Sequence, residues 1–453
     1  MAGLIYDKIL RYQVTVQCNG PLRIGNAVGS KEEVLIHPVD HKPFVQASSI
    51  AGALKNYYRS LPETNADALF GSAADEDESR VKISDGIFLD NEKFPLKLEL
   101  RPHVKINRLT GSVDAAKVQG TNEKAGQKFN IEYIGTGSAF TFTFDVYEIA
   151  KNDLKTEVNK IFAGLRDGAV QFGGKKSSGA GNVSLTELKY KAFDLKNAGE
   201  RKSWIDIEDR EPDYEDYIAR LPKDNVSSYL YRVVVSGKTE GSVQVKGIAV
   251  SDFGKNAPDS ENIKNAKEEY IIPGSSFKGT VRSQMEKIAE YMGAQTVIED
   301  TFGVSGKKNT DGRAGNIIFY DTIIGDKKVN EEMAIAHRIH IDKFTGGVFN
   351  KGLFSEKNAV GKVEFMIDIK DRNNPDATLG ILLLAMRDMA IGMMSVGNGF
   401  STGKGMIAVE NISIEKGGDA AKAVLNFKDG KKIDDPGNLI SSALSALKGG
   451  VSK

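Results

Sequence analysis

The sequence predicts an α+β protein built from two tandem copies of one domain, and three observations lead to this prediction. Four short motifs occur twice in the same order. The separation of the two occurrences is nearly constant, at 227 residues from Ser49 to Ser276, 235 from Gly111 to Gly346 and 224 from Gly181 to Gly405. Strand-like and helix-like segments also follow one another in the same way in both halves. A duplicated domain therefore explains the chain better than one continuous architecture.

Each copy is expected to begin with a strand and a helix. Residues 11–18 alternate apolar and polar side chains, as a strand with one buried face does, and residues 229–235 have similar β-rich character. A helix should follow in each copy, with Ser48 and Ser275 as N-caps. We expect these caps because a serine hydroxyl can accept a hydrogen bond from an unpaired backbone N–H.

The later part of each copy returns to strand and then to helix. Residues 139–146 and 362–369 alternate as strands, and helices should follow at about 153–165 and 377–394. The order β–α–β, β–α–β is that of the ferredoxin-like split pattern. The predicted fold class is therefore α+β, with two tandem ferredoxin-like, RRM-like domains.

A hairpin is predicted to project from each copy after a Thr-Gly pair. Residues 112–128 are rich in Gly, Lys, Asn and Gln and show little apolar periodicity, which is typical of a projection rather than of a core element. The counterpart at 347–361 is shorter and carries apolar side chains that could wedge between bases or pack on the parent domain. The sequence thus predicts the following division: 1–190 as a first domain, 191–225 as an acidic linker, 226–420 as a second domain, and 421–453 as a C-terminal extension with a disordered end.

Composition indicates a soluble protein of ordinary type. The chain has 453 residues, equal numbers of basic and acidic residues, and one cysteine, Cys18. Zero net charge argues against a surface that is basic throughout. A single cysteine excludes an intramolecular disulfide and a cysteine-rich zinc site, and it fits a reducing compartment. Because no apolar run is long enough to cross a bilayer and no signal peptide is evident, we expect a cytoplasmic location.

The glycine-rich segments 173–181 and 397–405 are the strongest local signal. Glycines permit close backbone approach, and successive N–H groups can form an anion-binding nest. Lysine and hydroxyl side chains accompany both segments. A plain hairpin turn would explain one such segment, but its occurrence in both copies favours anion binding.

The helix starts are the second signal. Residues 274–279, Gly-Ser-Ser-Phe-Lys-Gly, place backbone donors, two hydroxyls and Lys278 at one positive helix end, with Arg282 on the same face. Simple helix capping is the alternative explanation. The histidines make no catalytic pattern: His37 and His41 are four residues apart, but prolines at 38 and 43 argue against a helix there.

Taken together, these residues resemble the RAMP superfamily, the repeat-associated proteins of CRISPR systems. The resemblance rests on 270–282 (YIIPGSSFKGTVR), on 339–346 (IHIDKFTG) followed by 352–356 (GLFSE), and on the two glycine-rich segments. Each half is similar to the backbone subunit of type III effector complexes. The pair of halves resembles a fused, subtype III-D-like double-domain subunit.

The resemblance implies a function and partners. Members hold a guide RNA (crRNA) through its phosphates largely without regard to sequence, insert a thumb-like hairpin at regular intervals, and assemble with other effector subunits and target RNA. Some cut the target with a loop aspartate and a divalent metal, Mg²⁺ or Mn²⁺, using the 2′-hydroxyl as nucleophile. The expected function is a guide-RNA-binding backbone subunit that holds the guide–target duplex and cleaves target RNA. A purely structural, non-cleaving backbone subunit is the alternative.

The resemblance also assigns residues. The implied RNA-binding residues are Ser48, Ser49, Lys55, Lys105, Arg108, Lys175, Lys176, Ser177, Ser275, Ser276, Lys278, Arg282, His340, Lys343, Ser401 and Lys404. The first half departs from the family pattern, because Ala51 stands where the second half has Lys278. We therefore expect weaker or differently placed phosphate contact in that half.

The cleaving aspartate is expected in the second half. Ile36 occupies the family's aspartate position in the first half, and Asp40 or Glu33 is a poor substitute. The second half offers Asp252 and Asp259 as catalytic candidates, with Asp252 also as the metal ligand because it closely follows a strand end. That both aspartates merely lie on a solvated loop remains open.

Overall fold

The structure is a computed structural model, in which the chain divides into two compact units. The first comprises 1–98, 133–176 and 180–228, and the second comprises 99–132, 177–179 and 229–453. The residues described are 6–25, 33–71, 78–107, 113, 115–117, 124–126, 128–149, 154–207, 213–223, 227–247, 258–306, 311–418, 422–428 and 432–451.

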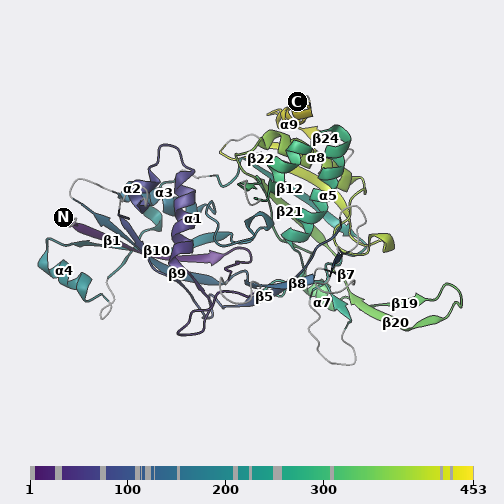
Figure 1. Ribbon diagram of the computed structural model, residues 1–453, viewed down its shortest axis with the longest axis horizontal. Coiled ribbons are helices and arrows are strands. Elements are labelled where there is room, and N and C mark those ends of the chain that lie inside the picture. The colour runs from purple at the N-terminus through teal and green to yellow at the C-terminus, as the bar shows by residue number, and fades with distance from the viewer. Residues whose placement is uncertain are drawn as a thin grey trace. The chain divides into compact units, whose positions relative to one another are not determined.

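The first unit is built on an antiparallel sheet covered by helices (Figure 1). The order of its four principal strands, fourth, first, third, second, is that of a ferredoxin-like domain. Along the sheet the strands are β11 (Glu215–Asp216), β10 (Val183–Asp194), β1 (Lys8–Cys18), β9 (Ala139–Glu148), β4 (Gly86–Phe88) and β2 (Phe44–Val45), with β3 (Val81–Ile83) also pairing β9. The helices are α1 (Ala47–Arg59), α2 (Ala66–Phe70), α3 (Lys155–Arg166) and α4 (Ala198–Ile205).

The core of the first unit follows the predicted alternation. Tyr12, Val14 and Val16 of β1 are fully buried, as are alternate phenylalanines of β9. The region predicted to be a linker contains α4 and packs on this unit. Tyr217 is buried among Tyr12 and Tyr190, and Trp204 packs against Phe193.

The second unit repeats the same topology. Its sheet runs in the order β17 (Ile317–Phe319), β21 (Lys362–Ile369), β12 (Tyr231–Glu240), β22 (Met406–Lys416), β23 (Lys422–Asn426) and β24 (Lys432–Asp434). Its helices are α5 (Gly274–Met292), α6 (Gln295–Phe302), α7 (Lys327–Glu332), α8 (Pro375–Ala390) and α9 (Leu439–Val451). The predicted fold class, two tandem ferredoxin-like domains, is confirmed.

One ion pair recurs at the same place in both sheets. On the first strand of each unit, Arg11 and Arg232 bind the facing aspartates Asp145 and Asp368 through Nε and a terminal nitrogen. Each guanidinium also lies over an aromatic ring. Equivalent strands therefore carry an equivalent two-point ion pair, which is what duplication of one domain produces.

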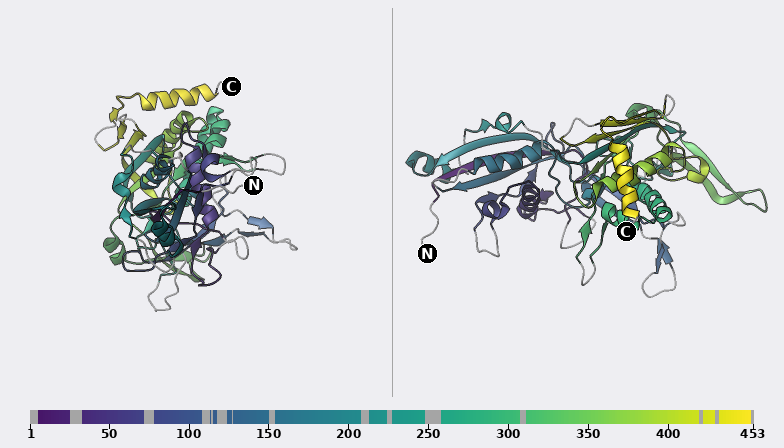
Figure 2. Two further views of the ribbon diagram at one scale, coloured as in Figure 1. Left: turned by 90° about the vertical axis from the view of Figure 1, so that its left-hand side faces the viewer. Right: turned by 90° about the horizontal axis from the view of Figure 1, so that it is seen from above.

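Small sheets and hairpins complete the second unit. The hairpin β19 (Ala336–Ile341) and β20 (Val348–Lys357) extends away from its sheet (Figures 1 and 2). A second inserted hairpin is formed by β5 (Leu98–Val104) and β8 (Lys128–Ile134), with β6 (Ala115–Lys117) and β7 (Lys124–Gly126) between them. The remaining short strands are β13 (Ser260–Glu261), β14 (Ile271–Ile272), β15 (Gly303–Val304), β16 (Arg313–Ala314) and β18 (Thr322–Ile323).

The C-terminal extension is folded as far as its last turn. Helix α9 packs on α8 so closely that a Cβ at Gly380 would lie 2.4 Å from the Ala443 carbonyl oxygen. The helix continues to Val451, into the stretch from Gly449 for which the sequence predicted disorder. Figure 2 shows α9, coloured yellow, at the edge of the unit.

Candidate nucleic-acid interface

The two serine-led helices begin two residues earlier than N-caps at Ser48 and Ser275 predict, and these serines are not N-caps. Helix α1 follows Gln46 and helix α5 follows Pro273, neither of which makes a side-chain cap. A distant aspartate caps each helix instead. Asp85 Oδ1 accepts from Ala47 N at 2.6 Å, and Asp321 Oδ1 accepts from Gly274 N at 2.8 Å.

These two aspartates are equivalent in the repeat. Asp85 lies between β3 and β4, and Asp321 lies between β17 and β18. A carboxylate at a helix N-terminus is stabilised by the helix dipole. Because the aspartate accepts from the first N–H of each helix, that N–H already has an acceptor. A phosphate would therefore have to bind the next N–H groups or the side chains.

At the start of α5, two of the predicted motifs meet. Lys278 Nζ donates to Ser177 Oγ at 2.7 Å, which joins a helix-start residue to a residue of the first glycine-rich segment. Ser275 and Ser276 are half-buried in the same turn of helix. Arg282, predicted on this face, is held by Glu286 at 2.8 Å and lies 5.0 Å from the centroid of the Phe302 ring.

The two glycine-rich segments have the same backbone conformation. Each contains one turn of 3₁₀ helix, η1 (Lys176–Ser178) or η3 (Phe400–Thr402). The glycine after each turn has a left-handed φ, +79° at Gly179 and +77° at Gly403. Because side chains rarely adopt this region, both tips require glycine there. Lys175, Ser177 and Ser401 are exposed on these tips, whereas burial lowers the pKa of Lys176.

Lys404 does not extend an exposed basic track. Its ammonium is buried, bound to Glu356, and 3.3 Å from Asn358 Oδ1. Arg338 bridges the same glutamate at 3.1 Å and donates to Thr402 Oγ1 at 3.2 Å. This network ties the second glycine-rich segment to both strands of the β19–β20 hairpin, so the charge of Lys404 is neutralised inside the unit.

The other predicted residues are scattered over the two units. Lys55 pairs with Asp67 at 2.8 Å and donates to the Gly71 carbonyl. Ser48, Lys105, His340 and Lys343 are exposed, and Ser49 is half-buried. Arg108 and Asp252 lie outside the described residues.

Asp259 is described, and its carboxylate is held by the base of a hairpin. Asp259 Oδ2 accepts from Ser355 N at 2.6 Å and from Ser355 Oγ at 3.0 Å. The bond from the Ser355 backbone, with smaller contributions including the charge of His337, lowers the pKa of Asp259. Within the described part of the chain, no group of three or more His, Cys, Asp or Glu side chains gathers as a metal site. Asp259 and its described neighbours therefore do not by themselves form a site for the expected divalent metal.

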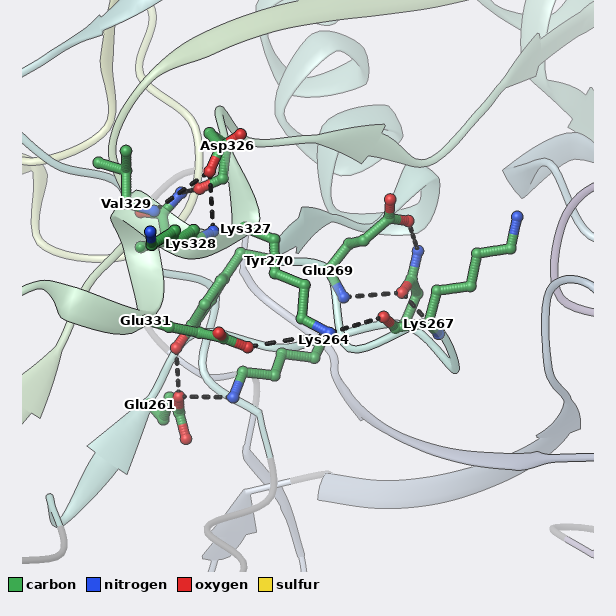
Figure 3. A network of polar contacts seen from close by, with 12 residues as sticks. Glu261, Lys264, Lys267, Glu269, Tyr270, Asp326, Lys327, Lys328, Val329 and Glu331 are labelled. Carbon is green, nitrogen blue, oxygen red and sulfur yellow. Dashed lines mark hydrogen bonds and ion pairs between the residues drawn. The ribbon is translucent and has the colours of Figure 1, made fainter.

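The segment between Asp259 and helix α5 is fixed by a polar network, shown in Figure 3. Tyr270 OH donates to Glu261 Oε1 at 2.6 Å, and Lys264 pairs with the same oxygen at 3.0 Å. Burial acts to raise the pKa of Glu261, but the bonds from Tyr270 and Lys264 lower it overall. Glu261 is thus held as a carboxylate, two residues after Asp259, so this end of the loop has a defined position.

Comparison with protein families identifies the fold family. The family model described as the RAMP superfamily matches residues 15–184 and 241–407. The chain belongs to the RAMP superfamily. The two matches place one RAMP region in each half, in agreement with the repeat.

Comparison with solved structures gives a weaker likeness. A chain in the cryo-EM structure of the type III-B Cmr-beta bound to cognate target RNA is 16% identical, with a TM-score of 0.31. The match covers 40% of this RAMP protein and 61% of that chain, which is less than two thirds of the latter's length. The search of curated proteins found no match. None of the described helices is long and apolar enough to cross a membrane.

Both hairpins of the RAMP protein carry a stacked histidine–phenylalanine pair. His340 and Phe349 have ring centroids 4.9 Å apart, and His103 and Phe129 have centroids 5.5 Å apart. Phe344, at the tip of the β19–β20 hairpin, is 98% exposed. The alternatives predicted for the apolar side chains of the 347–361 segment were exposure and packing on the parent domain. Exposure describes them, at 58% for Val348, 49% for Phe349, 64% for Leu353 and 37% for Phe354.

Several residues of the interface could not be found from the sequence. Asp85 and Asp321 cap helices that begin 38 residues before and 47 residues before them, respectively. Glu356 was visible only as part of the GLFSE motif, with no sign that it binds Lys404. The one available signal was the repeat, since an aspartate occurs at the equivalent place in both halves.

Proposed function

We propose that this RAMP protein is a guide-RNA-binding backbone subunit of a type III CRISPR ribonucleoprotein. Its partners would be crRNA, target RNA and other effector subunits, and its location the cytoplasm. The observation that carries the proposal is the contact of Lys278 with Ser177, which brings a helix start and a glycine-rich segment together. The finer assignment, a III-D-like double-domain subunit, is supported by the two ferredoxin-like units in one chain.

The chemistry of this contact suits a phosphate. A lysine ammonium has three donors, so it can bind the Ser177 hydroxyl and a phosphate oxygen together. Ser275 and Ser276 add hydroxyls at the positive end of a 19-residue helix. Contacts of this kind neutralise backbone charge without reading bases, as a subunit that accepts any guide sequence requires.

Target cleavage is the second part of the proposal. It depends on Asp252, which lies outside the described residues, or on Asp259, which is bound to Ser355. If a divalent cation binds there, it would stabilise charge on the scissile phosphate. The non-cleaving subunit stays the alternative, and Ile36 at the aspartate position supports it for the first half.

Replacement of Lys278 tests RNA binding. In the reconstituted complex, Lys278→Ala should weaken crRNA binding by about three- to tenfold at low salt and reduce the salt slope by about 0.7. Lys287→Ala, which removes an exposed lysine further along the same helix, is the matched control. Filter binding over a salt series measures both quantities. Equal affinity and equal slope for the two variants would refute phosphate binding at Lys278.

Replacement of the two aspartates tests cleavage. Asp252→Ala or Asp259→Ala should abolish cutting of target RNA next to this subunit, while crRNA content stays unchanged. Asp40→Ala in the first half is the control, because that side chain is exposed and lies in the half expected not to cut. If neither replacement alters the rate of cleavage next to this subunit, the subunit is structural.

A further inference from the structure

The pair Asn-Gly occurs at two places in the chain, at Asn19 and at Asn398. An asparagine is chemically labile when glycine follows it, because no side chain hinders attack of the next backbone nitrogen on the asparagine Cγ atom. Both asparagines are exposed, so burial does not distinguish them. Their hydrogen bonds do distinguish them.

The side chain of Asn19 is held in place directly after strand β1. Its Nδ2 donates to Asn182 Oδ1 at 3.3 Å, and its Oδ1 accepts from Ser184 Oγ at 3.1 Å. Before the Gly20 nitrogen can reach the Asn19 Cγ atom, the side chain must turn and break these bonds. The fold therefore slows any reaction of Asn19 with its neighbour.

Asn398 is fixed only through its backbone. Its N–H donates to the Gln244 carbonyl oxygen at 2.7 Å, and a Cβ at the preceding Gly397 would lie 2.5 Å from the same oxygen. The side chain of Asn398 makes no hydrogen bond or ion pair with any residue that the structure describes. A free side-chain amide thus lies beside the unhindered backbone nitrogen of Gly399.

The first glycine-rich segment lacks this pair. At the 224-residue offset of the repeat, Gly174 and Lys175 stand where the second segment has Asn398 and Gly399. The backbone is left-handed at both second positions, with φ of +60° at Lys175 and +88° at Gly399. The two segments therefore share a backbone conformation but differ in chemical lability.

We propose that Asn398 is a modification site, at which deamidation places a carboxylate on the second glycine-rich segment. The Gly399 backbone nitrogen loses its proton and attacks Asn398 Cγ. The new N–Cγ bond closes a succinimide ring, the Cγ–Nδ2 bond breaks, and Nδ2 leaves as ammonia. Water then opens either imide carbonyl to give aspartate or isoaspartate. Water is consumed and ammonia is released, so the reaction needs no oxidant or cofactor.

The new charge would oppose phosphate at the 397–405 segment, a consequence that rests on the proposed RNA-binding function. Lys404 of this segment is already neutralised by Glu356, so it does not offset the added carboxylate. A like charge close to a phosphate should lower crRNA affinity by about fivefold at low salt. A subunit that ages before assembly would then bind guide RNA less tightly.

Peptide mapping by mass spectrometry tests the modification in the full-length protein. The protein is incubated without RNA in mildly alkaline buffer, and both asparagines are followed in the same digest. Conversion at Asn398 should be about tenfold faster than at Asn19, because only Asn19 must first break hydrogen bonds. In denaturant the two rates should become similar, since both pairs lose their folded surroundings.

Three variants separate the causes. Ser184→Ala removes the bond to Asn19 Oδ1, so it should speed conversion at Asn19 by about fivefold and leave Asn398 unchanged. Asn398→Gln, whose longer side chain closes the ring slowly, should abolish conversion in the 397–405 segment. Asn398→Asp carries the product's charge and should lower crRNA affinity by about fivefold, whereas Asn398→Gln should bind as the wild type does.

Each outcome decides a stated point. Faster conversion at Asn398 that disappears in denaturant supports the modification. Equal conversion of the two asparagines in the folded protein, or a difference that persists in denaturant, overturns it. Wild-type crRNA affinity of Asn398→Asp would refute the consequence for RNA binding. The mapping uses no RNA, and the Lys278 variants probe a different element, so failure here is distinct from failure of the proposed function.

Discussion

Arg101 is the side chain whose loss should disturb the second unit most. It is buried, pairs with Glu99, and lies 2.7 Å from Asp321. Burial alone would lower the pKa of Arg101, but the charges of Asp321 and Glu99 raise it above its usual value. Asp321 in turn caps Gly274, so the cation supports the start of α5.

The expected loss of stability depends on the two carboxylates that Arg101→Ala leaves without their arginine. The side chains of Glu99 and Asp321 are 4% and 17% exposed, and both would lose the cation that pairs with them. Removing one member of a buried ion pair costs about 3–5 kcal/mol. This destabilisation should lower the protection of the amides in residues 274–292 against hydrogen exchange. Because each 1.4 kcal/mol is a factor of ten, the protection should fall by about 100-fold or more.

Hydrogen exchange followed by mass spectrometry is the assay, because it reports on each unit separately. Strand β1 of the first unit serves as the internal control and should keep its protection. The triple variant Glu99→Gln, Arg101→Met, Asp321→Asn removes the charges but keeps acceptors for the Ala266 and Gly274 amides, so it should recover most of the loss. If Arg101→Ala lowers the stability of the second unit by less than about 1 kcal/mol, the reasoning is refuted.

Two further predictions follow from local geometry. Gly164→Ala in α3 should destabilise the first unit by about 1–3 kcal/mol, despite alanine's better helix propensity, because the new Cβ would lie 2.1 Å from the Tyr57 ring; a raised thermal midpoint would contradict this. The folded-state pKa of Asp259 is depressed, so its link to Ser355 should be intact above the unfolded-state pKa and lost as pH falls through the folded value. The Ser355 amide shift measures this, and a flat titration would count against it.

The fold was predictable because duplication left matching patterns at every level. Alternation in β1 and β12, and helical spacing in α1 and α5, depend on neighbouring residues, so the sequence shows them directly. The contacts of the predicted linker were not foreseen, for a physical reason. Tyr217 and Trp204 lie in an acidic stretch, yet each packs against aromatic side chains of the first unit. Composition does not report such contacts.

At the site, only the features that depend on neighbouring residues in the sequence could be predicted. Glycines with left-handed backbone at Gly179 and Gly403 were expected from the pattern. The partner of Lys404 was not, because Glu356 comes from a strand 48 residues earlier and its burial depends on how the hairpin packs. A lysine beside glycines can therefore lie at the surface, where it can bind phosphate, or inside the unit, where an acidic side chain neutralises it.

Cross-linking of guide RNA to this subunit tests the central claim most directly. Ultraviolet irradiation of the purified complex, followed by mass spectrometry, should give adducts on peptides that contain Ser177 and Lys278, and on the 397–405 segment. Adducts confined to other subunits, or a complex that carries no RNA, would contradict the proposal that the duplicated RAMP domains hold the guide.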